Sequence, residues 1–176
     1  MSSSTLIRLG GLAAILAGLL RVIASFLPSS IPTVELEILY FLTDVFILFG
    51  LMGLYGYQHE EVGLWGFIGF LTATVGIGSI IGPDGEISGV SMYAVGASIY
   101  GVGLMLLAIG VWKANKLPHW IPLLWIISTI TGFIGYLVES YSLLFVTSGI
   151  MFGVSYAGAG LKVRSAMSNA RGVEEA

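Results

Sequence analysis

Residues 62–82, VGLWGFIGFLTATVGIGSIIG, form a mostly apolar stretch that contains no Asp, Glu, Lys or Arg. At the α-helical rise of 1.5 Å per residue, a helix of this length spans about 30 Å. That length matches the hydrocarbon core of a typical bilayer. The stretch therefore predicts one membrane-spanning helix.

Segments of similar length and character lie on both sides of it. The sequence predicts six spans, at residues 6–27, 34–57, 62–82, 91–112, 120–138 and 140–161. The last four contain no charged residue, whereas the first contains Arg8 and Arg21. We expect an all-α membrane protein with one six-helix domain over residues 1–164. A short polar tail over residues 165–176 is expected to be poorly ordered.

The composition favours the same class. Charged residues make up 10% of the chain, against about 25% in a typical soluble domain. Such a chain has too few polar side chains to cover a water-exposed surface. The net charge is −3, and the seven Lys and Arg residues are scattered. Nucleic-acid binding is therefore not expected, because phosphate contacts require clustered cations.

The loop charges predict an orientation. One side of the predicted bundle carries six basic residues, namely Arg8, Lys113, Lys116, Lys162, Arg164 and Arg171. The loops on the other side carry none. Under the positive-inside rule, both termini lie in the cytoplasm, which requires an even number of spans. Trp65, Trp112 and Trp120 lie toward the same side, as interfacial aromatic residues do.

A faint internal repeat runs through the chain. Tyr40 with Gly50-Leu51-Met52 recurs as Tyr93 with Gly103-Leu104-Met105. The spacing suits three similar helical hairpins, although membrane sequences of low complexity also produce such matches by chance.

Small residues at a spacing of four mark several helix faces: Gly10-Ala14-Gly18, Gly78-Gly82, Ala97-Gly101 and Gly149-Gly153-Ala157. Such faces let helix backbones approach closely in lipid. They predict packing within the bundle, or contact with a second copy or another membrane protein.

Arg21 and Asp44 are the charges that lie deepest in the predicted spans. Each costs about 2.5–3.5 kcal/mol at the bilayer centre on insertion scales, so each needs a reason to be there. Their predicted depths differ by about one helical turn, which the Arg21 side chain could bridge. Glu37 and Tyr40 share the helix face of Asp44. Glu139 follows the outer end of the fifth span and could join them. These five residues form a candidate intramembrane polar site, either a structural ion pair or a site for a proton or solute.

Other chemistry finds little support. His59 and His119 fall in predicted loops, so a haem between helices is not expected. The chain has no cysteine, no lysine within a span, and no nucleophile-elbow or phosphate-loop motif. We expect no metal, no cofactor and no enzymatic activity.

The first segment, Gly11 through Gly18 to Pro28, is apolar except for Arg21. It resembles the first hairpin of HdeD-like membrane proteins, small bacterial proteins of six helices in three similar hairpins. That resemblance implies a prokaryotic plasma membrane and a link to acid stress without a defined catalytic activity.

Two functions follow as hypotheses. The first is a non-enzymatic accessory, assembly or stress-related membrane component, whose partners are the lipid bilayer and other copies or proteins contacted through Gly-rich faces. The alternative is a small channel or transporter that uses the polar site around Arg21 and Asp44.

Overall fold

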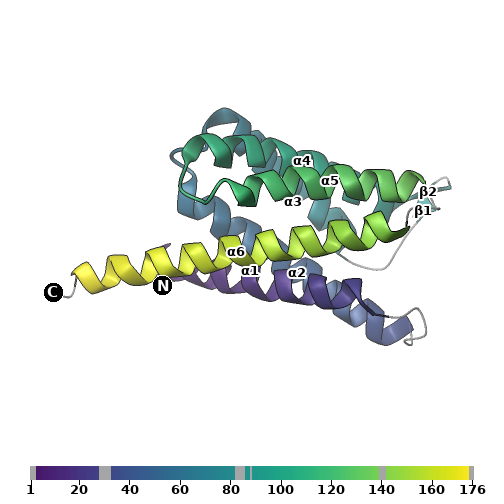
Figure 1. Ribbon diagram of the computed structural model, residues 1–176, viewed down its shortest axis with the longest axis horizontal. Helices are drawn as coiled ribbons and strands as arrows, with labels where there is room; N and C mark the ends of the chain where they lie inside the picture. Colours follow the sequence, from purple (N-terminus) through teal and green to yellow (C-terminus); the bar gives the residue numbers. More distant parts are fainter. Residues whose placement is uncertain (1–2, 28–32, 82–85, 88, 139–141, 175–176) are drawn as a thin grey trace.

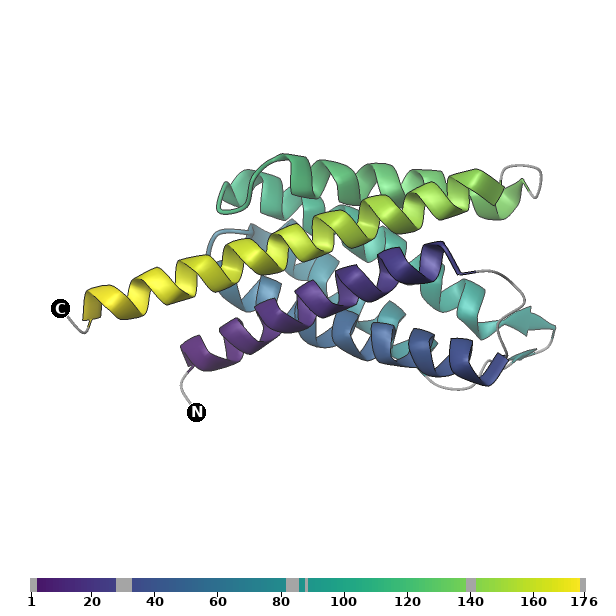
Figure 2. The ribbon, with the colours of Figure 1, turned by 60° about the horizontal axis from the view of Figure 1, so that its bottom comes forward.

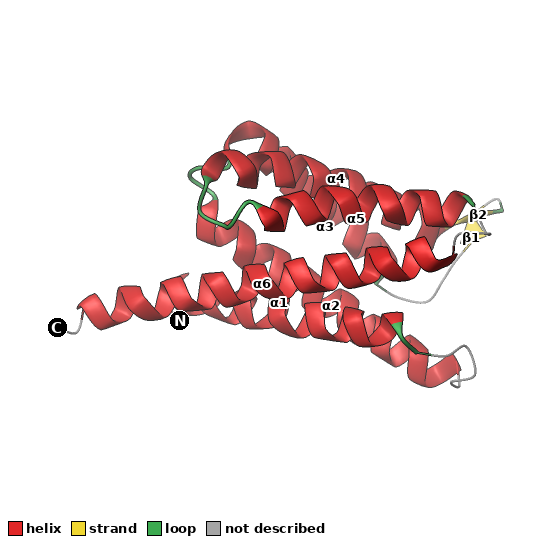
Figure 3. Cartoon of the chain, viewed as in Figure 1, coloured by secondary structure: helices red, strands yellow, loops and turns green. Residues whose placement is uncertain are grey.

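The computed structural model describes residues 3–27, 33–81, 86–87, 89–138 and 142–174. Helices account for nearly all of this part of the chain (Figures 1 and 3). They are α1 (Ser3–Ser25), α2 (Thr33–Gln58), α3 (Gly63–Ile80), α4 (Met92–Ala114), α5 (Trp120–Leu137) and α6 (Ser142–Glu174). All six are long and apolar enough to cross a membrane. The predicted helical fold and the six candidate spans are confirmed for the described residues.

The last helix is longer than predicted. It continues through most of the segment that was expected to be a poorly ordered tail and ends at Glu174. Val163 is fully buried and Met167 packs against the core, so tertiary contacts support the helix beyond the predicted span.

A short β-hairpin precedes α4 and was not predicted. Strands β1 (Glu86–Ile87) and β2 (Val90–Ser91) pair antiparallel, with Glu86 opposite Ser91. Gly89 has a φ of +79°, which favours glycine at this position. The Ser91 hydroxyl then accepts a hydrogen bond from the Ala94 amide at 3.3 Å and caps α4.

The helices form a bundle in which α1 packs against both α2 and α6. Figure 2 shows α1 between these two helices, with α3, α4 and α5 completing the bundle. The most extensive contact joins α3 to α4, whereas α2 and α3 touch much less. The start of α1 and the end of α6 lie at the same end of the bundle (Figure 2). The two helices of each predicted hairpin do pack together, but the sequence repeat itself stays a prediction.

Glycines allow the closest of these contacts. Gly10 on α1 meets Gly53 on α2, and Gly18 on α1 meets Gly153 on α6. A Cβ atom on any of these four residues would overlap the facing backbone. Most of the predicted small-residue faces are therefore used within the bundle. Gly78 is an exception, because a Cβ there would meet nothing within 4 Å.

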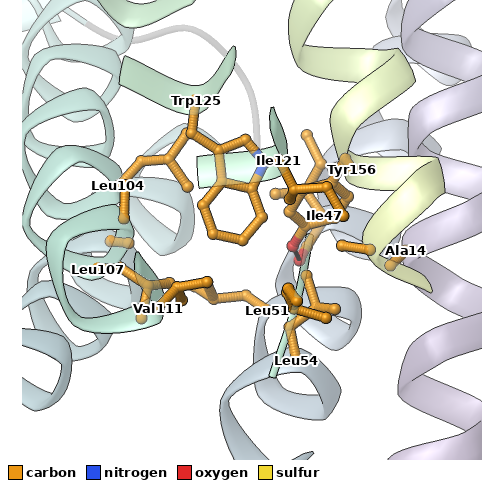
Figure 4. Close-up of a cluster of buried hydrophobic side chains, with 14 of the residues drawn as sticks. Ala14, Ile47, Leu51, Leu54, Leu104, Leu107, Val111, Ile121, Trp125 and Tyr156 are labelled. Atoms are coloured by element: carbon orange, nitrogen blue, oxygen red, sulfur yellow. Dashed lines mark hydrogen bonds between the residues drawn. The ribbon is translucent and has the colours of Figure 1, made fainter. Parts of the chain in front are cut away.

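All six helices contribute side chains to the apolar core, part of which is drawn in Figure 4. Trp125 on α5 and Tyr156 on α6 are the largest fully buried side chains. The Tyr156 hydroxyl donates a hydrogen bond of 2.7 Å to the Ile47 carbonyl of α2, which joins α6 to α2. The three tryptophans predicted to be interfacial, Trp65, Trp112 and Trp120, are exposed.

Candidate functional site

The bundle contains a partly open cavity of about 190 Å³ to which every helix contributes lining residues. The lining comes from the later parts of α1, α3 and α5 and from the earlier parts of α2, α4 and α6. Because the helices alternate in direction, these parts share the half of the bundle remote from the termini. The polar lining residues are Arg21, Asp44, Tyr93, Ser98, Tyr100, Ser128, Thr129, Tyr136 and Ser148.

Arg21 enters the cavity from α1. Its guanidinium carbon lies 6.0 Å from the centre of the Phe145 ring on α6, within the range of a cation–π contact. Gly149 of α6 lies beside the same part of α1, since a Cβ there would overlap the Ser25 hydroxyl and would be in ordinary contact with the Arg21 Nε atom at 3.6 Å. The close contact of α1 with α6 therefore sets the position of the guanidinium group.

Asp44 enters the cavity from α2. It lies one turn before Ile47, which lines the same cavity and is 5% exposed, so this face of α2 points inward. The adjacent Thr43 hydroxyl donates to the Leu39 carbonyl of its own helix at 2.7 Å. Asp44 is half-buried, as is Arg21.

The two charged groups share the cavity without touching. Within the part of the chain that the structure describes, no ion pair shorter than 4.0 Å involves Arg21 or Asp44, and neither of these two side chains makes a hydrogen bond. The direct ion pair that the sequence analysis considered is therefore not formed between them. Each presents its charge to the cavity instead.

Tyr100 places a hydroxyl group at the same cavity from α4. This hydroxyl is buried and has no hydrogen-bond partner among the described residues. The ring of Tyr100 packs edge-on against Phe152, with centroids 6.1 Å apart. A buried hydroxyl without a partner costs free energy, so the Tyr100 hydroxyl is a group that a ligand or water molecule in the cavity could satisfy.

Hydroxyl groups from three helices add acceptors. Ser148 donates to the Ser128 carbonyl at 2.7 Å, which joins α6 to α5. Ser98 and Thr129 donate to carbonyls of their own helices, Ala94 at 2.8 Å and Trp125 at 2.9 Å. Because these hydrogens are already used, the oxygen atoms remain as acceptors.

The predicted site is only partly assembled in this cavity. Arg21 and Asp44 come together, whereas Glu37 and Tyr40 are exposed on α2 and do not line it. Glu139 lies outside the described residues. Sequence analysis missed Tyr100, although Tyr93, Ala97, Tyr100 and Leu104 recur at helical spacing and all line the cavity.

The two histidines do not line the cavity. His119 stacks on Trp112 with ring centroids 4.9 Å apart. The Nε2 atom of His59 lies 3.9 Å from the Oε1 atom of Glu60. Both are exposed, at the end of the bundle where α4 ends. No group of three or more metal-ligating side chains occurs among the described residues.

No family model, curated protein or solved structure was found to match this chain. The resemblance to HdeD-like proteins therefore stays a prediction, and the function is argued from the cavity.

Proposed function

We propose that this protein is an integral membrane transporter that binds a small polar solute in the central cavity. One observation carries the proposal: all six helices converge on a cavity in which Arg21 and Asp44 are separate rather than paired. A structural ion pair would place the two groups in contact. Two separate charges in an apolar bundle are instead explained by a ligand that they bind.

The surface of the bundle supports a location in the membrane. Leu9, Leu12, Leu16, Leu19 and Ile23 are exposed along α1, and the other helices carry similar side chains. An exterior of this kind suits lipid contact, because a water-soluble protein rarely exposes such a large apolar surface. The bilayer is thus the first partner that we propose.

The loop charges support the proposed orientation in a prokaryotic plasma membrane. Arg8, Lys113 and Lys116 lie at the end of the bundle that holds the start of α1, as do Lys162 and Arg164. Under the positive-inside rule this end is cytoplasmic. Both termini are then inside, and the cavity lies in the outer half of the membrane.

The accessory or assembly function has less support. The small-residue faces could have served as contact surfaces for other proteins, but most of them pack within the bundle. Gly78 faces open space, so among the described residues of these faces it is one that remains available for contact with another copy or another membrane protein. The transport hypothesis explains why two charged residues line the central cavity, whereas the assembly hypothesis gives no reason for them.

Cysteine labelling tests the proposal. The chain has no cysteine, so a single introduced thiol gives an unambiguous signal. Ala97 on α4 lines the cavity, whereas Ala108, three turns later on the same helix, is fully buried and does not line it. In proteoliposomes, we expect a water-soluble, membrane-impermeant thiol reagent to label Ala97→Cys and to leave Ala108→Cys unmodified. Complete protection of both thiols would contradict a solute-binding cavity.

A further inference from the structure

We propose that the solute is a small zwitterion, bound with its anionic group against Arg21 and its ammonium group against Asp44. This inference rests on the proposed function and specifies its substrate class. Three features of the cavity carry it: the two unpaired charges, the aromatic and hydroxyl lining, and the volume.

The first feature is the charge pattern. Arg21 and Asp44 both line the cavity, and among the described residues neither has an ion-pair partner. A ligand with one charge would satisfy one of these groups and leave the other unmatched. A zwitterion satisfies both groups and leaves the occupied cavity neutral, which avoids the cost of a buried uncompensated charge.

The second feature is the remaining lining, which suits the two ends of such a ligand. The planar guanidinium group of Arg21 can hold a carboxylate through two parallel hydrogen bonds. Tyr100, Phe133 and Phe152 place aromatic rings in the cavity lining, and ring faces attract ammonium groups. The acceptor oxygen atoms of Ser98 and Thr129 suit N–H donors.

The third feature is size. The cavity of about 190 Å³ is smaller than the roughly 300–1,000 Å³ of sites for drug-sized ligands. It suits a compact solute with charges a few bonds apart.

Binding of matched ligand pairs tests the inference. Glycine betaine, β-alanine and γ-aminobutyrate are zwitterions with different charge separations. The tert-butylacetate, butyrate and valerate anions have nearly the same shapes, with carbon in place of the cationic nitrogen. By isothermal titration calorimetry on the purified protein, we expect at least one zwitterion to bind about tenfold or more tightly than its anion, a difference of about 1.4 kcal/mol. Equal affinity within all three pairs, or binding of no zwitterion, would overturn the inference.

Two carboxylate variants locate the ammonium group. Asp44→Asn is expected to abolish the preference for the zwitterion and to leave the matching anion bound as tightly as before or more tightly, because the unmatched carboxylate is gone. Glu37→Gln is the matched control, because Glu37 lies on the same helix but is exposed and does not line the cavity. It is expected to keep the full preference. A tenfold preference that survives in Asp44→Asn would contradict the assignment, and retained binding of the anion shows that the variant is folded.

The two proposals fail in different ways. If the thiol at position 97 is labelled but no zwitterion is preferred, the substrate class is wrong and the solute-binding cavity stands. If that thiol is protected, the proposed function fails and this inference fails with it.

Discussion

Replacing Gly18 by alanine probes the contact between α1 and α6, which positions Arg21 in the cavity. A Cβ on Gly18 would overlap the Gly153 carbonyl oxygen and would lie 2.8 Å from the Ala157 Cβ. Ordinary contact begins at 3.4 Å, so the Ala157 contact alone requires the helices to separate by 3.4 − 2.8 = 0.6 Å. A gap of this size forfeits about a quarter or more of the dispersion energy across the contact.

Overpacking costs about 1–3 kcal/mol. The overlap at Gly18 includes backbone atoms of Gly153 and Ala157, which cannot rotate away, so we expect the upper part of this range, about 2–3 kcal/mol. Alanine recovers up to about 1 kcal/mol through its higher helix propensity, so the net loss expected is about 1–2 kcal/mol. The matched control is Gly78→Ala, where a Cβ meets nothing within 4 Å and stability should be unchanged or slightly higher.

The free energy of unfolding of both variants is measured by titrating the denaturing detergent in mixed micelles. Equal stability of Gly18→Ala and Gly78→Ala would refute the proposed glycine contact between α1 and α6.

Two further predictions concern stability. Tyr156→Phe removes the 2.7 Å hydrogen bond to the Ile47 carbonyl and should lower the free energy of unfolding by about 0.5–1.5 kcal/mol in the same titration; no measurable change would show that this bond does not hold α6 to α2. The Lys116–Glu61 ion pair spans 2.6 Å, but both side chains are 36% exposed. Lys116→Ala should therefore lower the melting temperature only slightly, by an amount equivalent to less than about 1 kcal/mol. High salt should reduce this effect further, because it screens exposed charges. A large effect that does not depend on salt would contradict a solvated ion pair.

The six helices could be predicted from sequence because a bilayer imposes a length and an apolar composition on every span. The charge-free run at residues 62–82 and its neighbours carry that information locally. The end of α6 could not be predicted in this way, since burial of Val163 and contact of Met167 depend on helices distant in sequence. The β1–β2 hairpin was missed because it has only two residues in each strand.

The candidate site was predictable only in its charged members. Arg21 and Asp44 are conspicuous because ionised groups are costly within a span. Tyr100 is uncharged, and only the rotation of α4 decides whether its hydroxyl faces a cavity or lipid. Glu37 and Tyr40 share a helix face with Asp44 in sequence, but they lie near the start of α2 and do not line the cavity.

A double-mutant cycle on Arg21→Gln and Asp44→Asn tests the central claim most directly, because it separates a solute site from a structural ion pair. Without solute, we expect the two substitutions to be only weakly coupled in the free energy of unfolding, by about 0.5–1 kcal/mol, the low end of the range for residues that share a cavity. A coupling of about 2 kcal/mol or more in the empty protein would show that Arg21 and Asp44 stabilise each other directly, and would contradict the assignment of these charges to a bound solute.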